Sequence, residues 1–309
     1  HTSIYNSMNR VIFSIYIDIP KDELDEQPPH YGDTEDKNLK AKREFALHQP
    51  FLERSQRAYA EHIGVDYRIF KYDDKWKEFK AHYNKKYPML TAYNIVNFYK
   101  IYLMYELLGE YDEILYLDMD VVSITRKNFF TEFDLNKGIV IKKSNANYNL
   151  HIKPADVKVQ EARAAWGWKM HSNRSPNAKF WNAKAIIMEE GGDPSDNPVF
   201  NTGIIGVNKK YLKQLDYWKD FSYFMNLMTE LKNPDNGMWP QQFTDMFGWD
   251  NETLWGVKSN LNKVPAQFMN DKWHFIMDRV CHVPKQTNFI HIINKEFGWV
   301  REYCEKNSF

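Results

Sequence analysis

Blocks of apolar and polar residues along the chain predict alternating strands and helices. Val11 to Ile17 is a short apolar run rich in β-branched residues, which predicts a buried strand. Leu39 to Ile63 has helical periodicity, and we expect a break or kink at Pro50 because proline removes an internal hydrogen bond. Gly64 can end that helix in the left-handed conformation, and Val65 to Phe70 predicts a second strand. Strand, helix, glycine and strand in this order are typical of a parallel α/β sheet.

The same order recurs in the middle of the chain. Thr91 to Leu108 predicts a helix that ends at Gly109. Ile114 to Leu117 predicts a buried strand that runs directly into Asp118-Met119-Asp120. Ligands bind at the carboxyl ends of the strands in open α/β sheets, so we expect these two carboxylates at the binding edge.

The second half of the chain has a less regular pattern. It predicts strands at Gly138 to Lys142, Val199 to Val207 and Asn288 to Ile293. One helix is expected over Lys209 to Leu231, and another within Met238 to Phe247.

Two polar stretches are expected to be loops. Asp18 to Asn38 contains prolines, a glycine and many acidic residues, which favours a solvated loop. Lys143 to Ser175 is interpreted as a loop or a flap over the binding edge. Neither stretch suggests a linker between domains, and 309 residues suit one large α/β domain or one domain with a subdomain.

Composition excludes several classes of protein. The 41 Lys and Arg residues balance the 41 Asp and Glu residues, so no overall basic field exists to hold nucleic acid. No run of 18 apolar residues occurs, so we expect no membrane span. Two cysteines, Cys281 and Cys304, do not make a disulfide framework, and the compartment stays open between the cytoplasm and a lumen.

The Asp118-Met119-Asp120 triplet carries the clearest chemistry. Residues two apart in an extended chain point to the same side, so both carboxylates can share one hard cation. Mg²⁺ and Mn²⁺ prefer oxygen ligands and often bind together with substrate phosphates. Such a spacing is common by chance, and its ordinary interpretation is two acids in an exposed turn. The apolar strand before the triplet and the apolar pair Val121-Val122 after it argue for a metal site instead.

Several blocks resemble glycosyltransferase family 8, which includes glycogenin-like and lipopolysaccharide galactosyltransferase-like enzymes. Tyr111 to Val122 is similar to the family's "YDKVLYLDADVLV" block, and the preceding helix carries Phe98-Tyr99-Lys100. Further on, Phe200 to Asn208 resembles "FNSGVLVIN", Leu261 to Asn270 resembles "LP-x-x-YN", and Ile290 to Trp299 resembles "IHYxGxxKPW". Five blocks in the family's order are far more specific than the triplet alone.

The resemblance implies a fold and a division of the chain. It implies the GT-A fold, a mixed and mostly parallel central sheet flanked by helices. Residues 1–309 would form a single catalytic domain, with a nucleotide-sugar half at about 10–125 and an acceptor half at about 126–309.

The resemblance also implies roles for charged residues near the triplet. Asp118, Asp120 and His291 match the family's metal ligands, and imidazole favours Mn²⁺ over Mg²⁺. Lys295 matches the lysine that binds the diphosphate, and Lys100 matches a basic residue that reaches the donor. Each residue has an ordinary alternative. His291 could be a structural histidine, Lys295 a surface lysine, and Lys100 a lysine that extends from the helix to solvent.

The resemblance and the position in the chain suggest further donor contacts. The resemblance places Asn201 and Gly203 on the sugar and acceptor side, and Met119 lies within the triplet. Tyr16 and Asp18 follow the first strand and are candidate contacts for the base, taken as uracil, or for its ribose.

The match is weakest where the family has an Asp-Gln pair. Gln241 takes the place of the glutamine, but Pro240 stands where the acid is expected, and Asp245 replaces an asparagine. The family's last block also differs. Asn294 replaces its glycine, and Lys295 to Phe297 replaces its "KPW".

The implied reaction is transfer of a sugar from a nucleoside diphosphate, which the resemblance implies is UDP, to a hydroxyl of a glycan, a protein or a small molecule. Retention by front-face attack is favoured, with Gln241, Asp245 and Lys100 as catalytic candidates. The first alternative is an inverting enzyme with Asp245 as general base, or less favourably Asp193 or Asp196. The second is a catalytically weak sugar-binding protein with the same fold.

Overall fold

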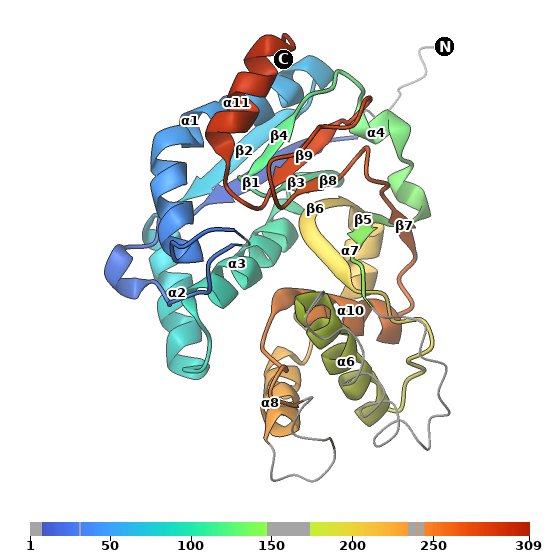
Figure 1. The fold of residues 1–309 in the computed structure, drawn as a ribbon. Coiled ribbons are helices and arrows are strands. Elements are labelled where there is room, and N and C mark those ends of the chain that lie inside the picture. The colour runs from blue at the N-terminus through green and yellow to red at the C-terminus, as the bar shows by residue number, and fades with distance from the viewer. Residues whose placement is uncertain (1–7, 31, 147–173, 234–238, 240–243) are drawn as a thin grey trace, which may run out of the picture. The chain divides into compact units, whose positions relative to one another are not determined.

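The computed structural model describes residues 8–30, 32–146, 174–233, 239 and 244–309. Strands and helices alternate through most of the chain (Figure 1). The strands are β1 Arg10–Tyr16, β2 Asp66–Lys71, β3 Glu113–Leu117, β4 Val121–Ser123, β5 Ile139–Lys143, β6 Phe200–Asn208, β7 Ala266–Phe268, β8 Phe275–Met277 and β9 Phe289–Ile292. The α-helices are α1 Lys37–Ile63, α2 Asp74–Lys86, α3 Ala92–Leu107, α4 Phe129–Glu132, α6 Arg174–Glu189, α7 Lys209–Leu215, α8 Phe221–Lys232, α10 Asn251–Leu261 and α11 Phe297–Lys306. Two short 3-10 helices are η1 Lys21–Glu23 and η2 Leu135–Lys137.

Six strands form a central mixed sheet in the order β2-β1-β3-β6-β5-β7. β1 is parallel to both β2 and β3, with Phe13 opposite Arg68 on one side and Tyr116 on the other. β3 and β6 are antiparallel, with Leu117 opposite Ile204. The carboxyl ends of β1, β2 and β3 therefore meet at one edge of the sheet, as the sequence predicts (Figure 1).

A smaller sheet has the order β4-β9-β8. In it, Val121 of β4 lies opposite His291 of the antiparallel β9. The chain leaves the central sheet after Leu117 and enters the small sheet at Val121. Asp118-Met119-Asp120 thus connects β3 of the central sheet to β4 of the small sheet, and this brings the triplet next to β9.

Helix α1 begins at an N-cap, Asp36, whose side chain accepts the backbone N–H of Asn38 and of Leu39. It ends at Gly64 with φ of 73°, as expected for a left-handed C-cap. The expected break at Pro50 is wrong, because the helix continues through this residue. The lost hydrogen bond costs about 3 kcal/mol. Packing of α1 against β2, β4 and α11 offsets that cost (Figure 1).

Most strands that the sequence predicts are present to within one or two residues. The single helix expected over Lys209 to Leu231 is wrong, because α7 and α8 are separated where Asp216 and Asp220 have positive φ values of 46° and 56°. L-residues in that conformation end a right-handed helix, and aspartate tolerates it better than most. The helices α2, α4, α6, α10 and α11 were not predicted. Lys143 to Ser175 lies largely outside the described residues, and half of Met238 to Phe247 does.

Contacts divide the chain into two compact units. Unit 1 is His1–Lys142, Gly203–Lys209 and Ala266–Phe309, and it contains the small sheet and most of the central sheet. Unit 2 is Lys143–Thr202 and Lys210–Pro265. In unit 2, α6 packs on α8 and α10, and Glu252 of α10 accepts hydrogen bonds from the Thr202 backbone N–H at 2.5 Å and from Lys179 Nζ at 2.5 Å.

The core of unit 1 is closely packed around β6 and α4. At Gly206 of β6, an added Cβ would lie 2.6 Å from two ring atoms of Phe129. Only glycine therefore fits here, because real Cβ atoms do not approach carbon so closely.

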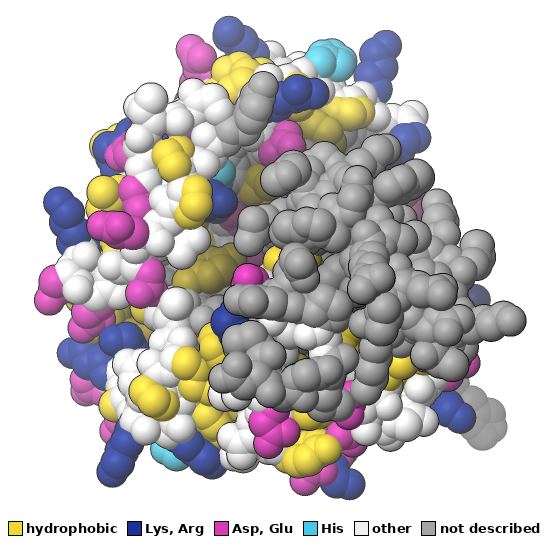
Figure 2. Space-filling model, turned by 60° about the horizontal axis from the view of Figure 1, so that its bottom comes forward, with side chains coloured by type: hydrophobic (Ala, Val, Ile, Leu, Met, Phe, Trp, Pro, Cys, Tyr) yellow, Lys and Arg dark blue, Asp and Glu magenta, His cyan; other side chains and the backbone are white. Residues whose placement is uncertain are grey.

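Charged side chains of both signs lie on the one face that Figure 2 shows. On the face shown in Figure 2, Lys and Arg side chains of the described residues are interspersed with Asp and Glu. Among the described residues, no helix is long and apolar enough to cross a membrane.

Candidate active site

The backbone of the Asp118 to Asp120 turn is held from three directions. The Asp118 N–H donates to the carbonyl of Gly203 on β6 at 2.8 Å. The fully buried Gln56 of α1 donates from Nε2 to the Asp118 carbonyl at 2.9 Å. The Asp120 carbonyl accepts the N–H of Ile292 on β9 at 2.8 Å. These bonds fix the positions from which both carboxylates project.

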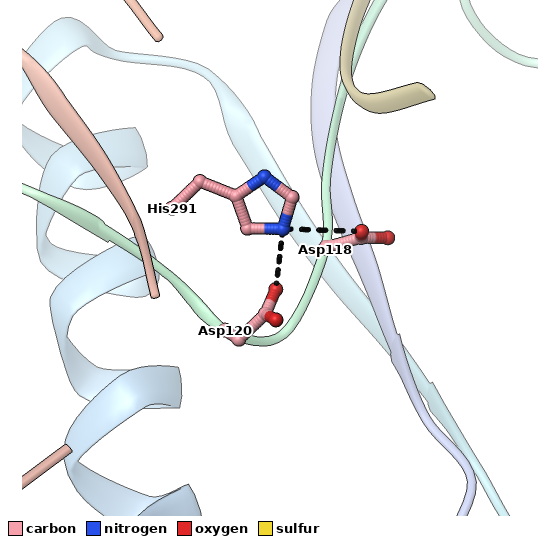
Figure 3. A group of neighbouring side chains, drawn as sticks. All are labelled: Asp118, Asp120 and His291. Carbon is pink, nitrogen blue, oxygen red and sulfur yellow. Dashed lines mark ion pairs between the residues drawn. The ribbon is translucent and has the colours of Figure 1, made fainter. Parts of the chain in front are cut away.

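Three side chains converge at this turn (Figure 3). His291 Nε2 lies 3.5 Å from Asp118 Oδ2 and 3.0 Å from Asp120 Oδ1. One ligand atom from each residue lies within 4.8 Å of the others. The structure thus brings together the three metal ligands expected from the sequence.

The remaining oxygen of each carboxylate is held by a different partner. Asp118 Oδ1 accepts the Tyr116 hydroxyl at 2.5 Å and lies 3.4 Å from Lys100 Nζ. Asp120 Oδ2 accepts from Lys295 Nζ at 2.5 Å. Each carboxylate therefore turns one oxygen towards its positive or phenolic partner and the other towards His291.

The three facing atoms fit a divalent cation. Around an octahedral ion with bonds of about 2.1 Å, neighbouring ligand atoms lie about 3 Å apart. The distances from His291 Nε2 are 3.0 and 3.5 Å. Asp120 Oδ1 is also buried, and its polar neighbour among the described residues is His291 Nε2. When His291 Nε2 binds a cation it cannot donate to this oxygen, and the same cation would then satisfy it.

Lys295 keeps Asp120 ionised. Burial alone would raise the pKa of Asp120, but the charge and hydrogen bond of Lys295, with His291 beside it, hold that pKa well below its usual range. Burial would likewise lower the pKa of Lys295, but Asp120 raises it above the ordinary value. Both groups are charged at neutral pH, so the ion pair is present before any ligand binds.

Lys100 and Tyr116 support Asp118 from the core. The Lys100 side chain is only 2% exposed, which excludes a lysine that extends to solvent. Its Nζ lies 5.0 Å from the centre of the Tyr116 ring, within the range of a cation–π interaction. Burial, together with the Asp118 charge, raises the pKa of Tyr116 well above the usual value, so the phenol stays protonated and donates.

Tyr16 and Asp18 lie at the carboxyl end of β1, the strand next to β3. Burial, together with Asp18, raises the pKa of Tyr16 to about 12, and its ring centre lies 5.7 Å from that of Phe45. Asp18 forms an exposed ion pair with Lys42 at 2.7 Å. Met119 is buried in the apolar cluster beside Val122, so any donor contact of Met119 would come from its backbone.

The residues expected on the acceptor side are only partly described. Asn201 and Gly203 lie on β6, and Gly203 contributes the carbonyl that fixes Asp118. Gln241 lies outside the described residues. Asp245 belongs to unit 2 and is exposed, and its backbone carbonyl accepts from Lys232 Nζ at 3.3 Å.

The alternative bases lie on a turn of unit 2. The Asp193 carboxylate accepts the backbone N–H of Ser195 at 2.9 Å. The Asp196 backbone carbonyl accepts from Asn260 at 2.8 Å.

Sequence reasoning missed three residues of the site. Gln56 carries a signal, since it is a polar residue at an inward position of a helix. Tyr116 also carries one, because it lies two residues before Asp118 on a strand and shares its face. His274, which contacts His291, carries no local signal, because 17 residues separate the two histidines.

The model of glycosyl transferase family 8 matches residues 7–299. The chain belongs to this family. It is therefore a nucleotide-sugar-dependent glycosyltransferase of the GT-A fold, and the expected fold class and enzyme class are confirmed. A search of curated proteins found no match.

Similar solved structures are distant in sequence. One is a glycosyltransferase involved in glycosylation of the major capsid of PBCV-1, with 12% identity, coverage of 96% of this chain and 99% of that chain, and a TM-score of 0.39. Another is the galactosyltransferase LgtC in complex with donor and acceptor sugar analogs, with 12% identity, coverage of 91% of this chain and 86% of that chain, and a TM-score of 0.41. A third is mouse xyloside xylosyltransferase 1 in its apo form, with 13% identity, coverage of 93% of this chain and 98% of that chain, and a TM-score of 0.41.

Proposed function

We propose that this family 8 enzyme uses Mn²⁺, held by Asp118, Asp120 and His291, to transfer a sugar from a UDP-sugar to an acceptor hydroxyl with retention. The observation that carries the metal is the convergence of Asp118 Oδ2, Asp120 Oδ1 and His291 Nε2 on one point. Imidazole among carboxylate ligands favours Mn²⁺ over Mg²⁺. UDP and retention rest on the family resemblance.

Charge explains why the ion and the diphosphate would bind together. Before ligands bind, the carboxylates of Asp118 and Asp120 are balanced by the ammonium groups of Lys100 and Lys295. A divalent ion adds two positive charges to this neutral set, and a diphosphate supplies the negative charge that offsets them. The ion alone should therefore bind weakly, and it should bind more tightly when UDP is present.

The residues of the chain would act on the leaving group. When bound, the divalent ion would supply Lewis-acid stabilisation of charge on the leaving diphosphate. Lys295 is already fixed beside Asp120 and would add a second positive charge to the diphosphate. Lys100 would orient Asp118 and reach the donor sugar or the diphosphate.

Retention would follow from attack on the face that the diphosphate leaves. The acceptor oxygen forms a bond to the anomeric carbon as the bond to the diphosphate oxygen breaks, and the acceptor proton passes to that oxygen. Gln241 would lie near the anomeric carbon, and Asp245 near the acceptor. Tyr16, Asp18, the Met119 backbone, Asn201 and Gly203 complete the proposed donor contacts.

We propose the same division of the chain that the family implies. The nucleotide-sugar half would be residues 10–125 and the acceptor half 126–309, within a single catalytic domain. The acceptor is a glycan, a protein or a small molecule.

A thermal-shift experiment tests the donor site. Wild-type protein is heated with Mn²⁺, with UDP, and with both, alongside Asp120→Asn and the control Asp74→Asn. Asp74 is a surface carboxylate of α2 that is 99% exposed, so its loss should change nothing. The expected result is greater stabilisation by the pair of ligands than by the sum of the two, lost in Asp120→Asn only. If no nucleoside diphosphate or nucleotide sugar stabilises the wild type in Mn²⁺, the proposal fails.

The anomeric outcome is tested separately. NMR of the first product formed from a UDP-sugar should show the configuration of the donor. An inverted product would replace this proposal with the inverting route, in which Asp245→Asn should abolish turnover while leaving UDP and Mn²⁺ binding intact.

A further inference from the structure

A second histidine lies directly behind the proposed metal ligand. His274 is fully buried, and its Nε2 lies 2.9 Å from His291 Nδ1. It immediately precedes β8, whose Ile276 is opposite His291 in the parallel register. The two rings are therefore brought together by the pairing of two strands.

The backbone of His274 is held firmly. Its N–H donates to the Asn270 carbonyl at 3.1 Å, and its carbonyl accepts from Lys142 Nζ at 2.8 Å. The imidazole consequently has little freedom to move away from His291.

Metal binding restricts which nitrogen of His291 carries a proton. A ligating nitrogen must present its lone pair, so Nε2 of His291 must be bare and Nδ1 must carry the hydrogen. The Nδ1–H then needs an acceptor, and His274 Nε2 lies at hydrogen-bond distance. For His274 to accept at Nε2, it must be neutral with its own proton on Nδ1.

The opposite arrangement suits the metal-free site. If His274 Nε2 carries the proton and donates to His291 Nδ1, then His291 Nε2–H points at Asp120 Oδ1, 3.0 Å away. That state also avoids placing a proton on His274 Nδ1, which is buried and has no hydrogen-bond partner among the described residues. A buried N–H without an acceptor costs about 1–3 kcal/mol.

We propose that His274 is a positioning residue that accepts the Nδ1–H of His291 and so selects the tautomer of His291 that binds the metal. This inference rests on the proposed metal site. Between the two states, each histidine loses a proton from Nε2 and gains one at Nδ1, so the pair keeps the same number of protons. The pair is then a two-state element whose equilibrium the metal shifts.

Two substitutions distinguish the loss of the hydrogen-bond acceptor of His274 from the loss of the volume of its ring. In His274→Gln, an amide oxygen can occupy the place of Nε2 and accept the same hydrogen. In His274→Leu, a side chain of similar volume fills the space and accepts nothing. Free Mn²⁺ is followed by electron paramagnetic resonance during titration of each protein at saturating UDP.

The expected result is a loss of Mn²⁺ affinity of about 10- to 100-fold in His274→Leu, as found for residues that orient metal-bound histidines. His274→Gln should stay within a few-fold of wild type. Thr287→Val is the matched control, because Thr287 is also buried in unit 1 and donates to the Pro284 carbonyl at 2.7 Å. It should lose stability and keep its Mn²⁺ affinity.

The wild-type protein supplies an independent measurement. Long-range ¹H–¹⁵N NMR of ¹⁵N-histidine protein with UDP and diamagnetic Mg²⁺ should show Nδ1–H on both His291 and His274. Equal Mn²⁺ affinity in His274→Leu and wild type, no recovery in His274→Gln, or an unprotonated Nδ1 in metal-loaded His291 would overturn the inference. If the leucine variant does not fold, the NMR result decides. Failure of the wild type to bind Mn²⁺ at all would instead count against the proposed function.

Discussion

Replacing Lys295 with methionine should have opposite effects on the metal-free protein and on the metal complex. In the metal-free protein, the substitution removes the ammonium group 2.5 Å from Asp120 Oδ2 and leaves a carboxylate that is only 8% exposed. Two unit charges about 4 Å apart interact by about 4 kcal/mol at an effective dielectric constant near 20. Breaking one side of a buried pair costs about 3–5 kcal/mol in other proteins. Both figures predict a similar loss of stability.

That loss should be visible as a lower melting temperature. For a chain of this size, 1 kcal/mol corresponds to about 2 °C, so Lys295→Met should unfold roughly 6–10 °C below wild type. The control is Lys75→Met. Lys75 pairs with Glu106, and both side chains are well exposed, so its loss should cost under about 1 kcal/mol.

Mn²⁺ should reverse part of the effect. In the variant, the ion no longer meets the charge of Lys295, and it can neutralise Asp120 directly. We therefore expect Mn²⁺ without nucleotide to bind at least about tenfold more tightly to Lys295→Met than to wild type. At a fixed, saturating Mn²⁺ concentration this adds about 1.4 kcal/mol to the stabilisation of the variant. With UDP present the order should reverse, because the diphosphate loses a cationic partner.

Calorimetric unfolding and titration of both proteins with Mn²⁺, with and without UDP, measure these quantities. Equal melting temperatures for the metal-free proteins would show that Lys295 does not stabilise Asp120. Stronger stabilisation of the wild type by Mn²⁺ alone would refute the argument that the ammonium group and the ion compete.

Three further outcomes are expected. Tyr116→Phe removes a 2.5 Å hydrogen bond to Asp118 and should weaken Mn²⁺ binding about tenfold, because hydrogen bonds to charged groups contribute about 1.5–3 kcal/mol; unchanged affinity by titration calorimetry would contradict this. Burial, with nearby lysines, lowers the pKa of His30 to about 4, so between about pH 6.5 and 4 the unfolded chain binds a proton that the folded chain does not. Stability should therefore fall with decreasing pH, and denaturant unfolding should show a smaller fall between pH 7 and pH 5 in His30→Gln, whereas equal slopes would show that His30 is not involved. Gly206→Ala places a Cβ 2.6 Å from Phe129 and should cost about 1–3 kcal/mol in urea unfolding, whereas a neutral result would mean that the ring moves freely.

The elements around the triplet follow from local sequence. The apolar run Ile114 to Leu117 predicts β3, and Thr91 with Gly109 brackets α3. Periodicity, caps and glycine stops act over a few residues, so they can be recognised without knowing the rest of the chain. The same local rules failed at Pro50, where packing against the sheets keeps α1 continuous. They also failed at Asp216 to Asp220, where the backbone turns out of the helical conformation.

Local patterns along the chain predict the strand–helix order of an α/β fold and place Asp118 and Asp120 at the carboxyl end of a strand, and the ordered motifs predict the family. Which atoms meet depends on the folded chain. The ion pair of Asp120 with Lys295 spans 175 positions, and the contact of His274 with His291 depends on β8 pairing with β9. The folded chain also decides which oxygen of each carboxylate faces His291, because Tyr116, Lys100 and Lys295 hold the others. Those contacts arise only when the sheets assemble, since spacing along the chain places no constraint on side chains so far apart.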